Sequence, residues 1–249
     1  MSYIKIEKLS KLSKSYKEKN IFQEFSLNIE KGSFISFVGP FGCGKTTLLK
    51  LLAGIENVDT GQIFINNQTP ETLKKDKKMG YVFQEPLLLP WKNVEENIRL
   101  PLELSHKHNF KKVDQLLKIV GLEEKKNNYP RALSGGMQQI VPILRAVIND
   151  PAVLLLDEPL SAIDEINRNK LQDILISLHK ANKQTTILVT HSIHEAVYLS
   201  DKVYILGDYP VQIMDCIKPK YPRMKRYKNS LETLKTVTKI RKKLEKAVK

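Results

Sequence analysis

The segment from Gly39 to Thr46, G-P-F-G-C-G-K-T, constrains the fold of this chain more than any other, because it fits the phosphate-loop template G-x-x-x-x-G-K-[S/T]. An alternating apolar run at residues 33–38 precedes it, and residues 47–53 read as a helix. Strand, loop and helix are the context that the template needs, so a glycine-rich turn without a ligand is the weaker interpretation. The sequence therefore predicts an α/β fold with a site for a nucleoside triphosphate.

The residue types of this loop suit phosphate binding. Gly39, Gly42 and Gly44 let backbone N–H groups turn toward phosphates, and a helix starting near Lys45 adds the positive end of its dipole. We expect Lys45 to reach the β- and γ-phosphates and the Thr46 hydroxyl to bind Mg²⁺. The expected nucleotide-binding residues of the loop are Gly39, Pro40, Phe41, Gly42, Cys43, Gly44, Lys45, Thr46 and Thr47.

The cysteines exclude some kinds of protein and leave one question open. Cys43 and Cys216 are too few for a disulfide framework or a thiolate metal site. Cys43 lies where a helix N-terminus and Lys45 can lower a thiol pKa, so a reactive thiol is one of two equally favoured interpretations. A packing role at this position is the alternative.

Length and composition indicate a globular protein. At 249 residues with 41% hydrophobic content, the chain has room for one domain with a subdomain, or for two modest domains. No apolar run approaches the ~18 residues that cross a bilayer, and the first residues lack the apolar stretch of a signal peptide. We therefore expect a cytosolic protein.

Most of the net charge of +14 lies in the C-terminal tail. Residues 216–249 contain 13 Lys and Arg against 2 Glu, whereas residues 1–215 contain 28 Lys and Arg against 25 Asp and Glu. A basic tail binds anionic lipid or nucleic acid, or is a solvated charged face. We favour the solvated face, with lipid contact as the second interpretation.

The N-terminal part predicts an antiparallel strand set, because apolar residues alternate through residues 3–7, 12–16 and 25–29 before a turn at Lys31-Gly32. Tyr16 lies 23 residues before Gly39. An aromatic ring there can stack on a purine, and a tyrosine on the sheet surface is the alternative.

Polar side chains follow three other predicted strands, and ligands of open α/β sheets bind at this carboxyl edge. The amide of Gln84 is placed to touch Mg²⁺ or a water molecule. Asp157 can hold Mg²⁺ through water, while Glu158 can orient and partly deprotonate an attacking water. His191 closes its strand in the same way. The three strands span residues 79–83, 152–156 and 185–190.

Helical periodicity dominates from residue 85 to about residue 150, which predicts a helical subdomain inserted into the α/β core. An apolar loop, Pro86–Trp91, opens this segment and carries the only tryptophan of the chain. Such a loop either contacts another protein or is buried against its own subdomain.

Together these residues resemble the nucleotide-binding subunit of ABC transporters over about residues 3–215. The segments Q-E-P-L-L-L-P-W-K-N-V-E-E-N-I and T-H-S-I-H-E-A-V-Y-L-S-D-K-V, with the basic tail, look like the nitrate/sulfonate/taurine-type importers, a group that also includes carriers of thiamine precursors. The motifs that carry the resemblance occur in the order of the family: the phosphate loop, Gln84, the signature L-S-G-G-M at 133–137, Asp157-Glu158, Asp164 and His191.

The resemblance implies a P-loop NTPase with the ABC-ATPase fold, including an antiparallel β subdomain and an inserted helical subdomain. The expected division is a nucleotide-binding core at residues 1–84 and 151–215, a helical signature subdomain at 85–150, and a basic extension at 216–249.

The resemblance also implies roles in binding ATP and Mg²⁺. Tyr16 would stack on adenine, and Lys45 with Thr46 would hold the phosphates and Mg²⁺. The roles at the strand ends are a nucleotide sensor at Gln84, Mg²⁺ support at Asp157, a catalytic base at Glu158 and a γ-phosphate contact at His191. The remaining expected nucleotide-binding residues are Asp164 and, in the site of an opposite subunit, Ser134, Gly135 and Gly136.

The expected function is a peripheral ATPase subunit on the cytoplasmic face of the cell membrane, which powers uptake of a small polar or anionic solute. Expected partners are membrane permease subunits, a second ATPase subunit in a homodimer and, indirectly, an extracellular solute-binding protein; no nucleic acid is expected. The alternative is a regulatory nucleotide-binding module with weak hydrolysis.

Two features depart from the family pattern. Ile140, Pro142 and Leu144 replace an arginine and two alanines of the helix after the signature, and a proline inside a helix costs about 3 kcal/mol unless the helix bends. We expect a kinked helix and weaker dimer closure. In the tail, apolar residues at 231, 234, 237, 240, 244 and 248 predict an amphipathic helix that packs on the core, pairs with a dimer mate or lies on the inner leaflet.

Overall fold

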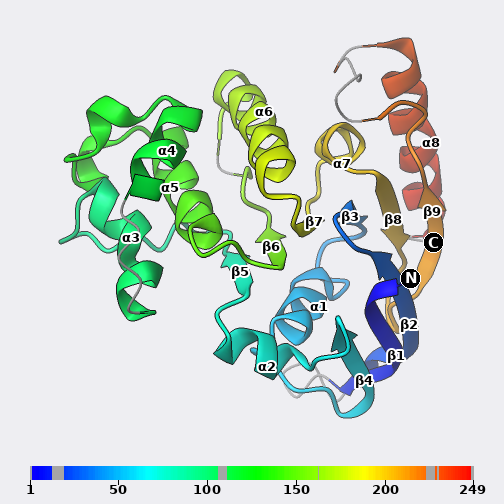
Figure 1. Cartoon of the computed structure of the whole chain (residues 1–249). Coiled ribbons are helices and arrows are strands. Elements are labelled where there is room, and N and C mark those ends of the chain that lie inside the picture. The colour runs from blue at the N-terminus through cyan, green and yellow to red at the C-terminus, as the bar shows by residue number, and fades with distance from the viewer. Residues whose placement is uncertain are drawn as a thin grey trace. The chain divides into compact units, whose positions relative to one another are not determined.

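The computed structural model describes residues 2–12, 20–105, 111–161, 163–222, 228 and 230–247. Its elements form two compact units, labelled in Figure 1. Unit 1 consists of Met1–Asp76 and Thr185–Lys249, and unit 2 of Lys77–Gln184. Tyr16 and most of the strand predicted at 12–16 lie outside the described residues.

The antiparallel sheet of unit 1 has the strand order β2-β1-β4 among the described residues. Ile6 of β1 lies opposite Leu27 of β2 and Ile63 of β4, and all three side chains are buried. The alternation that predicted antiparallel strands thus places one apolar face in the core. The bounds are β1 Ser2–Leu12, β2 Asn20–Glu30 and β4 Thr60–Ile65.

The second sheet of unit 1 has β3 between two parallel neighbours, β7 and β8, with β9 antiparallel to β8. Every residue of β3 and β7 is buried, as in parallel strands that helices cover. The helix α1 packs against β7, and α7 packs against β3. The bounds are β3 Phe34–Val38, β7 Thr185–Val189, β8 Lys202–Leu206, β9 Ile213–Ile217, α1 Lys45–Leu52, α2 Pro70–Lys75 and α7 Ile193–Leu199.

Unit 2 contains the helices α3, α4 and α5 within the segment 85–150 that the sequence predicted to be helical. It also contains the helix α6 and a parallel strand pair, β5 with β6. Gly80 of β5 allows close packing, because a Cβ there would lie 2.8 Å from the carbonyl oxygen of Ala146. The bounds are β5 Met79–Val82, β6 Val153–Asp157, α3 Val94–Leu104, α4 Lys111–Val120, α5 Gly135–Val147 and α6 Glu165–Asn182, with 3-10 turns at Glu123–Lys125 and Pro130–Ala132.

The helix after the signature, α5, runs unbroken through Pro142. Ile140, Pro142 and Leu144 are all buried, so the three departures from the family pattern form part of the apolar packing of unit 2. The predicted kink therefore does not interrupt the helix. Weaker dimer closure stays a prediction.

The C-terminal helix α8, Leu231–Ala247, packs on the core of unit 1 (Figure 1). Val237 and Ile240 are buried in a cluster with Ala196, Val197 and Ile205. Lys243 on the same helix pairs with Asp215 of β9 at 2.7 Å. Of the three roles left open for the apolar face, the structure shows packing on the core. Val248 lies outside the described residues.

We predict that Ile240→Ala lowers the free energy of unfolding by about 2–5 kcal/mol, because the Ile240 side chain is 0% exposed and its loss leaves a cavity. The matched control is Leu234→Ala on the same helix, since Leu234 is 42% exposed. Its loss should cost less than about 1 kcal/mol. Urea denaturation of both variants measures the difference, and equal losses would contradict the packing of α8 on the core.

Candidate nucleotide site

The phosphate loop connects β3 to α1 with a backbone that requires glycine. Gly42 and Gly44 have φ angles of +77° and +102°, in the left-handed region that side chains disfavour. A Cβ on Gly44 would also lie 2.7 Å from Ile21 Cγ2, whereas a Cβ on Gly42 would meet no atom within 4 Å. Gly39 has a different constraint, because a Cβ there would lie 2.9 Å from the Leu206 carbonyl oxygen.

Lys45 folds back over this loop. Its ammonium donates hydrogen bonds to the carbonyl oxygens of Gly39 at 3.0 Å and Pro40 at 2.6 Å, and the residue is 7% exposed. At the tip of the loop, the Phe41 side chain is fully exposed. The loop therefore holds one positive charge against its own carbonyl groups.

The start of α1 suits an anion. Gly44 is the N-cap residue and provides no side-chain hydrogen bond, and the first turn carries no acidic residue. No carboxylate of that turn therefore neutralises the positive end of the helix dipole or accepts from the first N–H groups of the helix. Thr46 is exposed and Thr47 half-buried in this turn. The residues present fit a phosphate group.

Cys43 packs inside the loop. Its side chain is fully buried, and its Sγ lies 3.8 Å from the Lys45 ammonium. Burial raises the pKa of the Cys43 thiol, and this effect outweighs the lowering by Lys45. Of the two equally favoured roles for Cys43, a reactive thiol disagrees with this burial, and a packing role agrees with it.

His191 lies in a turn whose backbone is fixed. The hydroxyl of Thr190 donates to Glu195 Oε2 at 2.7 Å and accepts from the Ser192 N–H at 3.0 Å. Ser192 in turn caps α7 by accepting from the Glu195 N–H at 3.3 Å. His191 itself is exposed. Its turn follows β7, which pairs with β3, so His191 and the phosphate loop follow neighbouring parallel strands.

Asp157 is the last residue of β6 in unit 2, and Glu158 is the first residue beyond it. Asp157 is buried and accepts a hydrogen bond from the hydroxyl of Tyr81 at 3.1 Å. Glu158 has a φ of +47°, a conformation that costs a residue with a side chain about 1–3 kcal/mol and that clusters at functional sites. Its carbonyl oxygen accepts from the N–H of Ser161 at 3.2 Å and from its hydroxyl at 3.0 Å, which closes the turn.

Gln84 is exposed just beyond β5, and β5 is the parallel neighbour of β6. Its carbonyl oxygen accepts from Gln139 Nε2 of α5 at 3.4 Å. Unit 2 therefore brings Gln84, Asp157 and Glu158 to the carboxyl ends of two paired strands, as the sequence predicted.

The signature opens α5 as expected. Ser134 is the N-cap residue, its Oγ accepts from the Met137 N–H at 3.4 Å, and no acidic residue occupies the first turn. Ser134 and Gly135 are exposed. The half-buried Gly136 faces α6, since a Cβ there would lie 3.4 Å from Asn167 Cβ.

Asp164 caps α6. Its carboxylate accepts from the backbone N–H of Asn167 at 3.1 Å and from the side-chain amide of Asn167 at 2.7 Å. These hydrogen bonds lower the pKa of Asp164 below its ordinary value. The described contacts thus give Asp164 a structural role beside the expected contact with a nucleotide.

The apolar loop Pro86–Trp91 is exposed but held in place. Trp91 is 70% exposed and Leu87 is 51% exposed, which argues against burial of the loop in its own subdomain. The fully buried Asn97 accepts from the Leu89 N–H at 2.9 Å and donates to the Leu89 carbonyl at 3.1 Å. Arg145 of α5 donates to the carbonyl oxygen of Leu87 at 3.0 Å. The hydrogen bonds from Asn97 and Arg145 that hold the loop were not predicted from the sequence.

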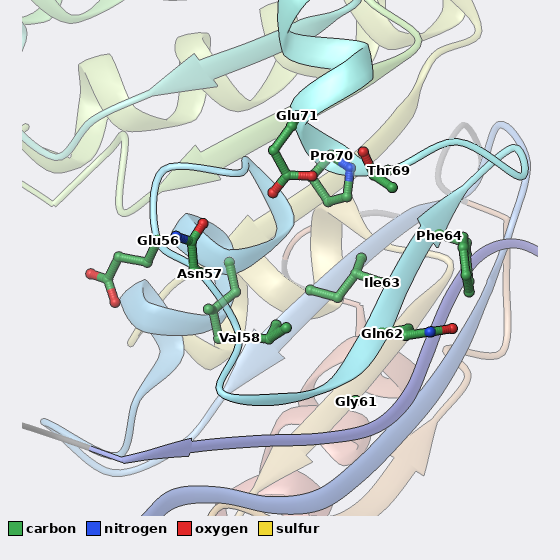
Figure 2. A pocket seen from close by; sticks show the side chains of 11 residues that line it. Glu56, Asn57, Val58, Gly61, Gln62, Ile63, Phe64, Thr69, Pro70 and Glu71 are labelled. Atoms are coloured by element: carbon green, nitrogen blue, oxygen red, sulfur yellow. The ribbon is translucent and has the colours of Figure 1, made fainter.

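A separate hollow of about 360 Å³ lies at the end of α1 remote from the phosphate loop. Figure 2 shows the side chains that line it, among them the apolar Ile63 of β4 and Val58, with Pro70 and Glu71 of α2. The described residues that line this hollow include none that the sequence predicted for the nucleotide site.

Comparisons with known proteins agree with this fold and these motifs. The family model described as ABC transporter matches residues 22–161. An aliphatic sulfonates import ATP-binding protein, SsuB, from Bacillus cereus is 41% identical over 237 residues, or 94% of each chain. The uncharacterized ABC transporter ATP-binding protein MJ0412 from Methanocaldococcus jannaschii is 37% identical, over 86% of this chain and 81% of the relative.

Solved structures give the same result. The dimeric structure of MJ0796, a bacterial ABC transporter cassette, is 30% identical with a TM-score of 0.75, covering 88% of this chain and 100% of that chain. A dimeric post-hydrolysis state of MJ0796 bound to ADP and Pi is 29% identical with a TM-score of 0.76, over the same shares of the two chains.

The phosphate loop, the strand-end carboxylates and the signature define a P-loop ATPase of the ATP-binding-cassette class. The chain belongs to the ABC transporter family, as an ATP-binding subunit. It binds nucleotide and is an ATPase, so the resemblance drawn from the sequence is confirmed.

We predict that Cys43 does not react with a thiol reagent at pH 7 in the folded protein, because burial both blocks access and raises its pKa. A raised pKa leaves less thiolate at pH 7 than an ordinary cysteine has. We expect any labelling of the folded protein to occur at Cys216, which is exposed. Labelling of Cys43→Ser and Cys216→Ser, folded and in denaturant, separates the two thiols. Rapid labelling of folded Cys216→Ser would contradict the packing role.

Proposed function

We propose that this chain powers the uptake of aliphatic sulfonates, or of a closely similar small anionic solute, through a separate membrane permease. The observation that carries the proposal is the high identity, 41% over 94% of the chain, to an aliphatic sulfonates import ATP-binding protein. Relatives of the same name from Bacillus subtilis (strain 168) and from a Pseudomonas are 42% and 41% identical over 197 residues. Within the wider group expected from the sequence, these names favour the sulfonate.

We further propose that the phosphate loop holds the β- and γ-phosphates of ATP. The uncapped first turn of α1 and the Lys45 ammonium supply the positive charge, and left-handed Gly42 and Gly44 turn backbone N–H groups into the loop. The carbonyl oxygens of Gly39 and Pro40 that Lys45 now contacts would give up that ammonium to phosphate oxygens. Tyr16 stays the proposed partner of the adenine ring.

Mg²⁺ fits a site with few protein ligands. Within the part of the chain that the structure describes, no group of three or more His, Cys, Asp or Glu side chains is arranged to hold a metal ion. Mg²⁺ keeps several waters and binds through one or two protein groups plus substrate phosphates. We propose the Thr46 hydroxyl as a ligand, with Asp157 and Gln84 acting directly or through water. When bound, the ion neutralises charge on the phosphates.

Glu158 is the proposed general base and His191 the proposed contact to the γ-phosphate. The closed turn after β6 fixes the backbone of Glu158 in a left-handed conformation, which aims its carboxylate differently from a residue that continues the strand. Glu158 would orient the attacking water and accept its proton. Asp157, held by Tyr81, would stay with the metal ion.

We propose that the chain acts as a head-to-tail homodimer. The N-terminus of α5, with Ser134 at its cap and no acidic residue in its first turn, suits the γ-phosphate held by the partner subunit. Asp164, the N-cap residue of α6, is proposed to contact the same nucleotide. ATP then joins two subunits, and hydrolysis releases them. The dimeric structures of MJ0796 support this arrangement.

The exposed apolar loop Pro86–Trp91 is the proposed contact with the permease. Arg145 connects the loop to α5, the helix that begins with the signature, so movement of that helix reaches the loop through a hydrogen bond. The subunit would therefore lie peripherally on the cytoplasmic face of the membrane. The structure has no helix, among its described residues, of the length and apolarity that a bilayer crossing requires. An extracellular solute-binding protein would act indirectly, through the permease.

The regulatory alternative gains no support from the described residues. The substitutions that suggested it, Ile140, Pro142 and Leu144, are buried in the packing of unit 2. None of them is a residue proposed to touch the nucleotide.

We predict that the purified chain hydrolyses ATP and that Glu158→Gln lowers the rate at least ~100-fold, because the amide cannot accept the proton of water. The variant should still bind ATP, since its phosphate loop is intact, and should accumulate as an ATP-dependent dimer. Phosphate release measures the rate and light scattering measures the dimer.

The control for this experiment is Glu165→Gln, which changes an exposed carboxylate in the first turn of α6. It should hydrolyse ATP as the parent does. Hydrolysis by Glu158→Gln at the parental rate would contradict the role of Glu158 as general base. Absence of hydrolysis by the parent would favour the regulatory alternative.

A further inference from the structure

The turn between β8 and β9 is fixed against the phosphate loop. The N–H of Gly207 donates to the carbonyl oxygen of Gln212 at 2.9 Å, which closes the turn. The N–H of Val211 donates to the carbonyl oxygen of Ile21 at 2.7 Å, which ties the turn to β2. Residues 208–211 are therefore held at both ends, within the same unit as the phosphate loop.

Two glycines of the phosphate loop are in close contact with this hairpin. Val211 is fully buried, and a Cβ on Gly44 would lie 3.2 Å from its Cγ2. A Cβ on Gly39 would lie 2.9 Å from the carbonyl oxygen of Leu206, the last residue of β8. The hairpin thus supports both ends of the loop.

Tyr209 contacts the middle of the loop. Its hydroxyl donates a hydrogen bond to the carbonyl oxygen of Gly42. In a planar trans peptide, the carbonyl of one residue and the N–H of the next point in opposite directions. Holding the Gly42 carbonyl toward Tyr209 therefore turns the Cys43 N–H away from Tyr209.

The Cys43 N–H and the Lys45 ammonium point at the same carbonyl oxygen, that of Pro40. The N–H donates to this oxygen at 3.4 Å, and the ammonium donates to it at 2.6 Å. Both donors thus converge on one acceptor, where an oxygen of a phosphate group can replace the carbonyl. The 3.4 Å bond is long, so little is lost when Cys43 exchanges its partner.

We propose that Tyr209 is a positioning residue of the phosphate loop, which presents the Cys43 N–H to a phosphate of the bound nucleotide. The inference deepens the proposed function and rests on nucleotide binding by this loop. Tyr209 is 41% exposed, so its ring is not a core residue. A phosphate contact of this loop that is equal before and during hydrolysis would make Tyr209 contribute to affinity and not to the chemical step.

The test is Tyr209→Phe, which removes only the hydroxyl. We expect the dissociation constant for ADP and the KM for ATP to rise roughly five-fold, the effect of one neutral hydrogen bond. The kcat should stay within about two-fold of the parent, because the lost interaction stabilises the bound substrate and the transition state equally. Calorimetric titration with ADP, steady-state hydrolysis and the thermal midpoint of the nucleotide-free protein are measured together.

Tyr221→Phe is the matched control. Tyr221 is 43% exposed in unit 1, and the Lys220 ammonium lies 5.5 Å from its ring centroid. It should bind ADP as the parent does.

Two results would overturn the role of Tyr209: parental ADP affinity in Tyr209→Phe, or weaker affinity accompanied by a lowered thermal midpoint, which indicates a structural effect. If the parent binds ADP without hydrolysing ATP, the proposed transport function fails, and the ADP titration still decides the role of Tyr209.

Discussion

The backbone of the phosphate loop is the constraint on which the rest of the site depends. Gly42 and Gly44 hold left-handed conformations, and the ammonium of Lys45 bonds to carbonyl groups of the same loop. Such a backbone needs rigid supports, because left-handed conformations have little local preference of their own. The supports are a buried central strand before it, a helix after it and the β8–β9 hairpin beside it.

The same plan recurs at the other strand ends. In unit 1 the turn of His191 follows the neighbour of β3. In unit 2 Asp157 is the last residue of β6, and Gln84 lies just beyond its parallel neighbour β5. Buried parallel strands hold the backbone, while the residues at their carboxyl ends and just beyond carry polar side chains. Glu158, directly after β6, has a strained backbone conformation. Such strain is expected where the direction of a carboxylate matters more for function than the stability it costs.

Sequence reasoning identified the elements and motifs well, because these depend on local patterns. Strand alternation, the phosphate-loop template and the apolar strand before Asp157 each occupy a few consecutive residues. What it missed depends on contacts between distant segments. Tyr209 lies 167 residues from Gly42, and the Tyr81 hydroxyl is 76 residues from Asp157. No spacing rule within the chain predicts either pair.

Two open questions also depended on tertiary structure. A thiol at a helix N-terminus reads as reactive until its burial is known, and Cys43 is fully buried. Amphipathic periodicity shows that the C-terminal helix has an apolar face but not what covers it. In the structure Ala196, Val203 and Ile217 cover that face.

Sulfonate uptake in the protein's own host is the most direct measurement of whether ATP hydrolysis by this chain drives transport. The gene would be deleted and replaced by the parent or by Lys45→Ala, and cellular accumulation of an alkanesulfonate would be measured beside that of sulfate. We expect that deletion and Lys45→Ala both abolish sulfonate uptake and leave sulfate uptake unchanged, while the parent restores sulfonate uptake. Unchanged sulfonate uptake in the deleted strain, or full restoration by Lys45→Ala, would contradict this role of the chain.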